Sequence, residues 1–171
     1  MKAFGAVVMG VILCLPLVGY LSYRGVASIQ WDRAVGGHLK RAADANSVEL
    51  AKQELEVVVK YLDEHNIKTG YTSVFWTTPD EDVGFWYTNI TTCLNQLKAL
   101  PEHATQGEKD MVLMKLRQTL LDHKGGHETV TEPSGIHLFP SNGAFAGVFA
   151  VTLMVALCGC CFFLYALSEV S

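Results

Sequence analysis

Two long stretches of the chain lack charged residues, and the segment between them has almost no cysteine. Residues 3–23 and 138–168 contain no Asp, Glu, Lys or Arg. Of the five cysteines, four lie in these two stretches, which leaves Cys93 alone between them. One thiol cannot form an internal disulfide framework, so the segment between the stretches is not a disulfide-stapled domain.

Basic residues are also scarce. The sequence has 13 Lys and Arg against 17 Asp and Glu. All of the basic residues except Lys2 and Arg24, and all of the acidic ones except Glu169, lie in the segment of residues 25–141. That segment is therefore acidic and offers no basic surface that could follow a nucleic-acid backbone. We expect no nucleic-acid partner.

Motifs for catalysis and cofactor binding are missing as well. The sequence contains no phosphate-binding loop, dinucleotide fingerprint or haem attachment motif, and its Ser and Thr residues are scattered. His123, His127 and Glu128 have the best metal-like spacing, but residues 125–126 are both glycine and interrupt the expected helix between the two histidines. We interpret this group as a solvated helix end. We expect no catalytic residue, no metal site, no cofactor and no enzyme activity.

Each uncharged stretch is long enough to cross a bilayer. A helix of about 20 apolar residues spans a hydrocarbon core of about 30 Å. We therefore predict an N-terminal transmembrane anchor at residues 1–24, a soluble helical domain at 25–141, and a C-terminal transmembrane helix with a short tail at 142–171. Small residues at 25–27 would also suit signal-peptide cleavage, but the length of the first stretch and the presence of a second favour an uncleaved anchor.

Small residues recur at helical spacing within both expected spans. Such residues, one turn apart, let helices approach closely in lipid. We predict that five of them mediate helix packing in the membrane: Gly143, Gly147, Ala150, Ala6 and Gly10. The sequence Cys-Gly-Cys-Cys at 158–161 is interpreted in the same way, as packing of small residues, in preference to acylation near a membrane boundary.

The clearest amphipathic helix of the soluble segment covers residues 78–100. Thr78 and Glu81 have the spacing of a capping box, Pro79 suits the first helical position, and Pro101 stops the helix. Phe85 lies on an otherwise polar face of this helix. We expect Phe85, together with Trp76, to contact a partner protein.

Three further helices are expected around it. One covers residues 28–45 with a bend at the two glycines 36–37, one starts at Asn46 with a capping box to Glu49, and one starts with a capping box at Thr105 and Glu108. We predict that the last ends at the glycines 125–126 and that an irregular segment follows. The apolar stripes place five residues in the core: Trp86, Ile90, Leu55, Val58 and Leu116.

Residues 68–77 connect two of these helices and favour an extended backbone. We interpret them as an ordered connector whose aromatic side chains lie across the helices. The predicted fold is all-α: two transmembrane helices, N- and C-terminal, bracket a soluble antiparallel bundle of about four helices with an extended aromatic connector.

This layout favours a non-catalytic integral membrane accessory or scaffold subunit of a homo- or hetero-oligomeric assembly, with membrane lipid and other membrane subunits, or itself, as partners. The alternative is a sensor-like extracytoplasmic ligand-binding bundle between two spans, which resembles bacterial chemoreceptor and histidine-kinase input domains in layout only. Arg24 and the basic residues after it favour a cytoplasmic insert, but that rule weakens beyond about 60 residues. We predict a plasma or inner membrane protein with residues 25–141 extracytoplasmic.

Overall fold

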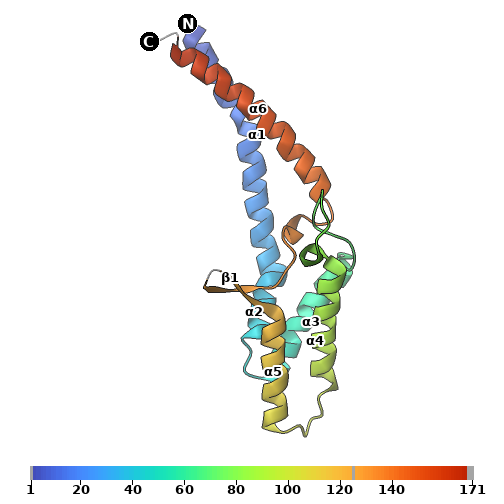
Figure 1. Cartoon of the computed structure of the whole chain (residues 1–171). Coiled ribbons are helices and arrows are strands. Elements are labelled where there is room, and N and C mark those ends of the chain that lie inside the picture. Colours follow the sequence, from blue (N-terminus) through green and yellow to red (C-terminus); the bar gives the residue numbers. More distant parts are fainter. Residues whose placement is uncertain (1, 125, 169–171) are drawn as a thin grey trace. The chain divides into compact units, whose positions relative to one another are not determined.

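The computed structural model describes residues 2–124 and 126–168, and most of them are helical (Figure 1). In chain order the elements are α1 (Lys2–Trp31), a π-helical turn (Asp32–Gly36), α2 (Gly37–Ala43), α3 (Val48–Glu64), a 3-10 turn (Pro79–Glu81), α4 (Val83–Ala99), α5 (Gln106–Leu120), β1 (Leu121–Lys124), β2 (His127–Val130), a second 3-10 turn (Ile136–Leu138) and α6 (Asn142–Ser168). The prediction of a mostly helical chain is confirmed.

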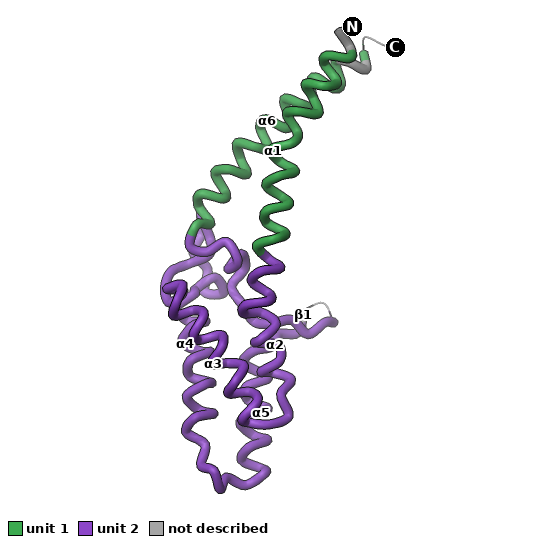
Figure 2. The backbone as a smooth tube through the Cα atoms, turned by 180° about the vertical axis from the view of Figure 1, so that it is seen from behind, with its two compact units in different colours: residues 1–27, 141–171 green, residues 28–140 purple. Residues whose placement is uncertain are grey.

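The chain divides into two compact units (Figure 2). Residues 1–27 and 141–171 form the first, which we call the hairpin unit because it consists of most of α1 together with α6. Residues 28–140 form the second, the helical unit. The predicted soluble domain, residues 25–141, has nearly the same bounds as the helical unit.

Two helices are long and apolar enough to cross a membrane, by length and composition. They cover Phe4–Ala43, where α1 continues into α2, and Asn142–Tyr165 within α6, with mean hydropathies of 2.3 and 2.4 over their most apolar windows. These are the two apolar helices that the uncharged stretches predict. Their length and composition are those that a membrane span requires.

The core of the helical unit forms where four helices meet. α3 packs against α2 and α4, and α5 contacts all three. Amphipathic helices of this length depend on such packing, because isolated short helices are marginal in water. The five residues expected in the core all lie in it, each at most 6% exposed: Trp86, Ile90, Leu55, Val58 and Leu116.

The bend expected at the two glycines 36–37 takes the form of a π-helical turn. The turn covers Asp32–Gly36, and the backbone N–H of Gly37 donates to the carbonyl oxygen of Asp32. A Cβ at Gly37 would lie 2.8 Å from that oxygen, and a Cβ at Gly36 would lie 2.9 Å from the Asp32 carboxylate. The wide turn therefore constrains position 37 to glycine, whereas the Asp32 side chain near position 36 can move, and the helix continues through the turn into α2.

α4 begins later than the sequence predicts. The expected start at Thr78 is wrong: Pro79–Glu81 forms a separate 3-10 turn, and Asp82 caps α4 by accepting from the backbone N–H groups of Gly84 and Phe85 at 2.8 and 3.0 Å. The reason lies in the connector. Thr72 N–H donates to the Glu81 carbonyl at 3.1 Å and Val83 N–H donates to Gly70 at 2.9 Å, which holds Asp82 in an extended conformation.

The other two expected caps have different outcomes. Thr105 and Glu108 form the predicted capping box at the start of α5. At the start of α3 the cap is Ser47 and not Asn46, since the Ser47 hydroxyl accepts from the Leu50 N–H at 3.2 Å. Both residues are good caps, and the extended backbone at Ser47 decides between them.

The predicted helical course up to residues 125–126, followed by an irregular segment, is wrong. α5 ends at Leu120, and β1 and β2 form an antiparallel pair with the register Leu121↔Val130 to Lys124↔His127. The buried side chain of Leu121 and the half-buried one of Val130 pack on the core, which favours a ladder over a continued helix. The all-α prediction therefore needs one correction, a short two-stranded hairpin.

Candidate interaction surfaces

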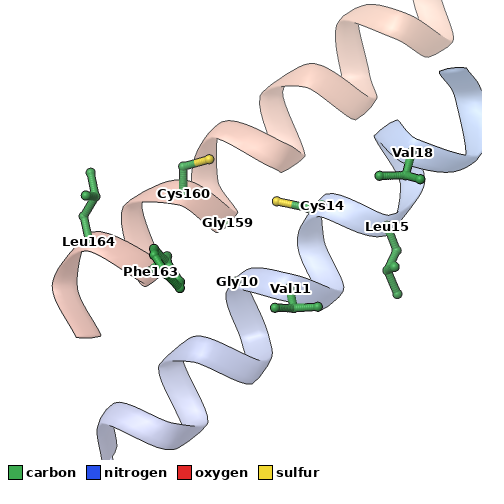
Figure 3. Close-up of a pocket in the computed structure, with 9 residues that line it drawn as sticks. All are labelled: Gly10, Val11, Cys14, Leu15, Val18, Gly159, Cys160, Phe163 and Leu164. Atoms are coloured by element: carbon green, nitrogen blue, oxygen red, sulfur yellow. The ribbon is translucent and has the colours of Figure 1, made fainter. Parts of the chain in front are cut away.

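α1 and α6 touch through two glycines in the hairpin unit (Figure 3). A Cβ at Gly10 would lie 2.9 Å from the carbonyl oxygen of Gly159, and a Cβ at Gly159 would lie 2.8 Å from the carbonyl oxygen of Gly10. Real side chains do not tolerate such distances to backbone atoms. The two helices can therefore approach this closely only where both residues are glycine.

The contact between these helices extends away from the glycine pair. The ring centroids of Tyr20 and Phe149 lie 5.5 Å apart, and those of Tyr23 and Phe145 lie 5.3 Å apart in a stacked arrangement. Aromatic pairs at these distances add to the apolar contact. Because early residues of α1 meet late residues of α6, the two helices run antiparallel.

The predicted small-residue positions separate into two groups. Gly10 belongs to the contact with α6, with Gly159 of the 158–161 segment as its counterpart, and Ala6 is half-buried. Gly143, Gly147 and Ala150 are exposed. Among the described residues, nothing lies within 4 Å of a Cβ placed at Gly143 or Gly147. The small-residue face of α6 is thus left uncovered by α1.

An open apolar groove lies beside the glycine pair. Its volume is about 460 Å³, and its walls expose only apolar atoms, among them those of Val11, Cys14, Val18 and Phe163 (Figure 3). A groove of this kind can take an acyl chain or the side chains of a neighbouring helix. It carries no polar group that would orient a soluble substrate.

The helical unit exposes apolar and aromatic side chains on the connector and on the first turn of α4, where Tyr71 is bridged to the cap residue Asp82; we call these residues the exposed aromatic surface: Tyr71, Val74, Phe75, Trp76 and Phe85. Phe75 and Trp76 are 80% and 81% exposed, Phe85 is 64% exposed, and their neighbours Tyr71 and Val74 are 46% and 44% exposed. The two predicted contact residues, Phe85 and Trp76, both belong to it. The expectation that the connector's aromatics lie across the helices is wrong for Phe75 and Trp76.

The connector keeps its aromatics outside because other residues hold its ends. Ile67 and Thr72 are buried, at 5% and 3% exposure, and Gly70 lies against the Phe139 ring, where a Cβ would come within 3.2 Å. Gly70 also has a φ of 112°, which favours glycine. With the backbone fixed at these points, the turn between Ser73 and Thr77 projects its side chains away from the core.

Two tryptophans hold the segment that leads from β2 towards α6. Trp31 Nε1 donates to Glu132 Oε2 at 2.8 Å, and Trp86 Nε1 donates to the carbonyl oxygen of Thr131 at 2.7 Å. The two indole rings lie 6.2 Å apart. Burial raises the pKa of the Glu132 carboxyl, the bond from Trp31 lowers it in part, and the charge of Asp32 raises it further.

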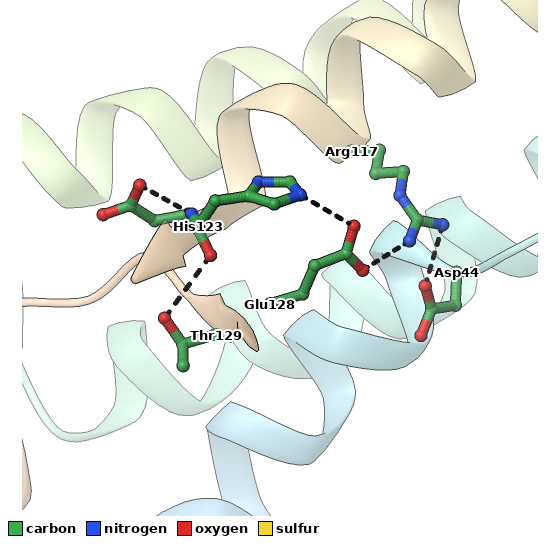
Figure 4. Close-up of polar contacts among 6 residues, drawn as sticks. Asp44, Arg117, His123, Glu128 and Thr129 are labelled. Carbon is green, nitrogen blue, oxygen red and sulfur yellow. Dashed lines mark hydrogen bonds and ion pairs between the residues drawn. The ribbon is translucent and has the colours of Figure 1, made fainter. Parts of the chain in front are cut away.

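The group with metal-like spacing, His123, His127 and Glu128, lies in the β1–β2 hairpin, where His123 and Glu128 form ion pairs (Figure 4). Glu128 accepts from Arg117 at 2.6 Å and pairs with His123 at 3.2 Å, while Arg117 also reaches Asp44 at 3.0 Å. His127 stands opposite Lys124 in the strand register. These exposed pairs join the β1–β2 hairpin, α5 and the end of α2. Such pairs contribute only about 0–1 kcal/mol each to the stability of the fold.

Comparison with protein-family models, curated proteins and solved structures finds no match for this chain.

Proposed function

We propose that this chain is a non-catalytic membrane subunit that works by contact with other membrane proteins or with further copies of itself. In this proposal α1 and α6 span the membrane as a hairpin anchor. The helices α2–α5 form an antiparallel bundle carried on one side of the membrane. The observation that carries the proposal is the uncovered small-residue face of α6, formed by Gly143, Gly147 and Ala150.

This face supports the proposal because α1 of the same chain could have packed on it but does not. Had α1 packed on Gly143 and Gly147, the small residues would serve only to close the hairpin. Instead Gly10 lies against Gly159, further along α6. In lipid, where apolar side chains gain nothing by leaving the solvent, close backbone packing is a principal source of attraction between helices. The uncovered face is therefore suited to a helix from another subunit.

The rest of the hairpin unit supports a membrane setting. Large apolar side chains are exposed along both helices: Phe4, Ile12, Leu15, Leu21, Val151, Met154, Leu157 and Leu164. Contiguous apolar surface of this extent is rare on soluble monomers and indicates contact with lipid or protein. In a membrane, lipid around the hairpin unit would cover most of this apolar surface, and a partner helix would cover the small-residue face.

The first test is the substitution Gly147→Ile. The branched side chain would hold a partner helix away from the face, and we expect association to weaken by about tenfold or more, which corresponds to about 1.4 kcal/mol. The measurement is the size distribution of the purified full-length protein in mild detergent, with whatever subunits copurify, over a range of protein-to-detergent ratios.

Gly19→Ile is the matched control. Gly19 also lies in an apolar helix, and a Cβ there has nothing within 4 Å among the described residues. Equal weakening by both substitutions would show that the α6 face is not the contact. A wild-type protein that runs as a lone monomer in several mild detergents would contradict the subunit proposal and put the ligand-binding bundle first.

A further inference from the structure

We propose that the exposed aromatic surface of the helical unit binds the headgroup–acyl boundary of the membrane that holds α1 and α6. The proposal rests on the proposed function, because it requires those helices to be in a membrane. It assigns to Tyr71, Val74, Phe75, Trp76 and Phe85 a lipid partner in place of the protein partner that the sequence suggests for Phe85 and Trp76.

The chemistry of the surface fits the lipid interface. Trp, Tyr and Phe gather at the boundary between headgroups and acyl chains because they combine a large apolar body with, in Trp and Tyr, a polar group. Phe75 and Trp76 are adjacent and almost fully exposed, and residues 69–79 contain no charged side chain. The exposed side chains of Thr69, Thr77 and Thr78 are polar but uncharged, and headgroups and interfacial water can solvate them.

Protein interfaces share these aromatic residues but usually differ in the side chains around them. Their apolar centre is surrounded by a polar rim, and Arg is enriched among the residues that dominate binding. Here the connector offers aromatic and hydroxyl side chains, and the first charge after it is Asp80. The acidic residues at 80–82 do not favour anionic lipid, so the proposed partner is a zwitterionic interface bound through apolar contact.

The place of the surface in the chain supports the same partner. The base of the connector is fixed at Gly70, against the ring of Phe139. Phe139 lies three residues before Asn142, the first residue of α6. A chain extends at most about 3.6 Å per residue, so this base lies within roughly 15 Å of the start of the membrane helix. Trp76 is six residues beyond Gly70, and six extended residues can span roughly 20 Å, which is enough to reach the headgroup layer of about 5–8 Å next to the start of that helix.

Trp76 also provides the probe. The chain has three tryptophans, and Trp31 and Trp86 are buried at 5% and 6% exposure, while Trp76 is 81% exposed. The full-length protein is reconstituted into phosphatidylcholine vesicles, with and without lipids brominated near the start of the acyl chain. The fluorescence of wild type minus that of Trp76→Phe isolates Trp76, and phenylalanine keeps the surface apolar.

We expect the Trp76 fluorescence to be quenched by the brominated lipid and to be protected from iodide in the water. The residual fluorescence of Trp76→Phe should respond less to either quencher. Quenching by iodide without quenching by bromine would place the loop in water and overturn the proposal. Protection from both would mean that protein covers the loop, and this result would also overturn it.

A separate measurement distinguishes failure of this inference from failure of the proposed function. Alkaline carbonate extraction of the same vesicles reports whether the chain is integral to the membrane. A protein that resists extraction but exposes Trp76 to iodide keeps its anchor and loses the lipid-binding surface. A protein that is released by carbonate overturns the anchor, and the lipid-binding surface with it.

Discussion

The side chain of Glu132 accepts a hydrogen bond that links two segments, and it lies where a negative charge is unfavourable. It accepts a hydrogen bond from Trp31 at 2.8 Å, which links the end of α1 to the segment after β2. It is also partly buried and close to Asp32, and burial followed by that charge raises its pKa above the ordinary 4.5. The folded protein therefore holds a proton on Glu132 at a pH where the unfolded chain has released it.

The sign of the resulting pH dependence follows from that difference. Between pH 4.5 and the raised folded-state pKa, the folded state binds more protons than the unfolded state, so this group makes stability fall as pH rises. Glu132→Gln keeps an acceptor for Trp31 but does not titrate. We expect the free energy of unfolding of the variant, relative to wild type, to increase with pH across this window.

The measurement is denaturant unfolding in detergent, followed by tryptophan fluorescence at a series of pH values. All other titrating groups are common to both proteins, so the difference isolates Glu132. Parallel curves for wild type and variant would contradict the assignment.

At the scale of elements, the π-helical turn is the feature that most constrains the sequence. It joins α1 to α2 without interrupting the helix, and it brings the Asp32 carbonyl to within 2.8 Å of the Cβ position of Gly37. In an ordinary helix, replacing glycine by alanine stabilises by roughly 0.5–1 kcal/mol, because alanine loses less backbone freedom on folding. Here the added methyl group would meet a backbone oxygen.

Gly37→Ala should therefore destabilise the protein, by about 1–3 kcal/mol, as overpacked sites do. Gly107→Ala is the control, since Gly107 lies in the first turn of α5 with nothing within 4 Å of a Cβ among the described residues. We expect it to be stabilising by roughly 0.5–1 kcal/mol. Opposite signs in denaturant unfolding support the steric role of the turn, and a stabilising Gly37→Ala refutes it.

What the sequence could predict about the elements depends on how local each cause is. The core positions of α3 and α4, such as Leu55 and Ile90, follow from a stripe of apolar residues with helical period, which burial on one face requires. The start of α4 does not follow, since Thr78 and Asp82 are both good caps and the choice is made by hydrogen bonds to Gly70 and Thr72. The β1–β2 hairpin does not follow from the sequence either, because its four-residue strands are short and its glycines also suit a helix stop.

In the interaction surfaces, too, the features with a local cause follow from the sequence and those set by distant contacts do not. The sequence shows the small residues in the apolar helices. It does not show the pairing of Gly10 with Gly159, which joins opposite ends of the chain and has no local pattern. The exposure of Phe75 and Trp76 depends on the anchoring of the connector at Ile67, Gly70 and Thr72, which no periodicity reports.

For the whole molecule, the two units are joined at residues 27–28 and 140–141, so the helical unit is a single insert between the two apolar helices. If both helices span a membrane, the ends of α1 and α6 that lie away from the insert are on the opposite side from it. The insert is far longer than the loops of about 60 residues to which the positive-inside rule applies, so Arg24 and Arg33 do not fix its side. The extracytoplasmic location of residues 25–141 therefore stays a prediction from the sequence.

We therefore expect a cysteine placed at exposed Glu102 to react with an impermeant maleimide from outside intact cells, and a cysteine at Lys2 to react only after the membrane is opened. Glu102 lies between α4 and α5, away from the ion pairs that engage Glu128. Labelling of the unsubstituted protein gives the background from the five native cysteines. Reaction at Lys2 but not at Glu102 in intact cells would reverse the topology, and reaction of both from outside would show that α1 does not cross the membrane.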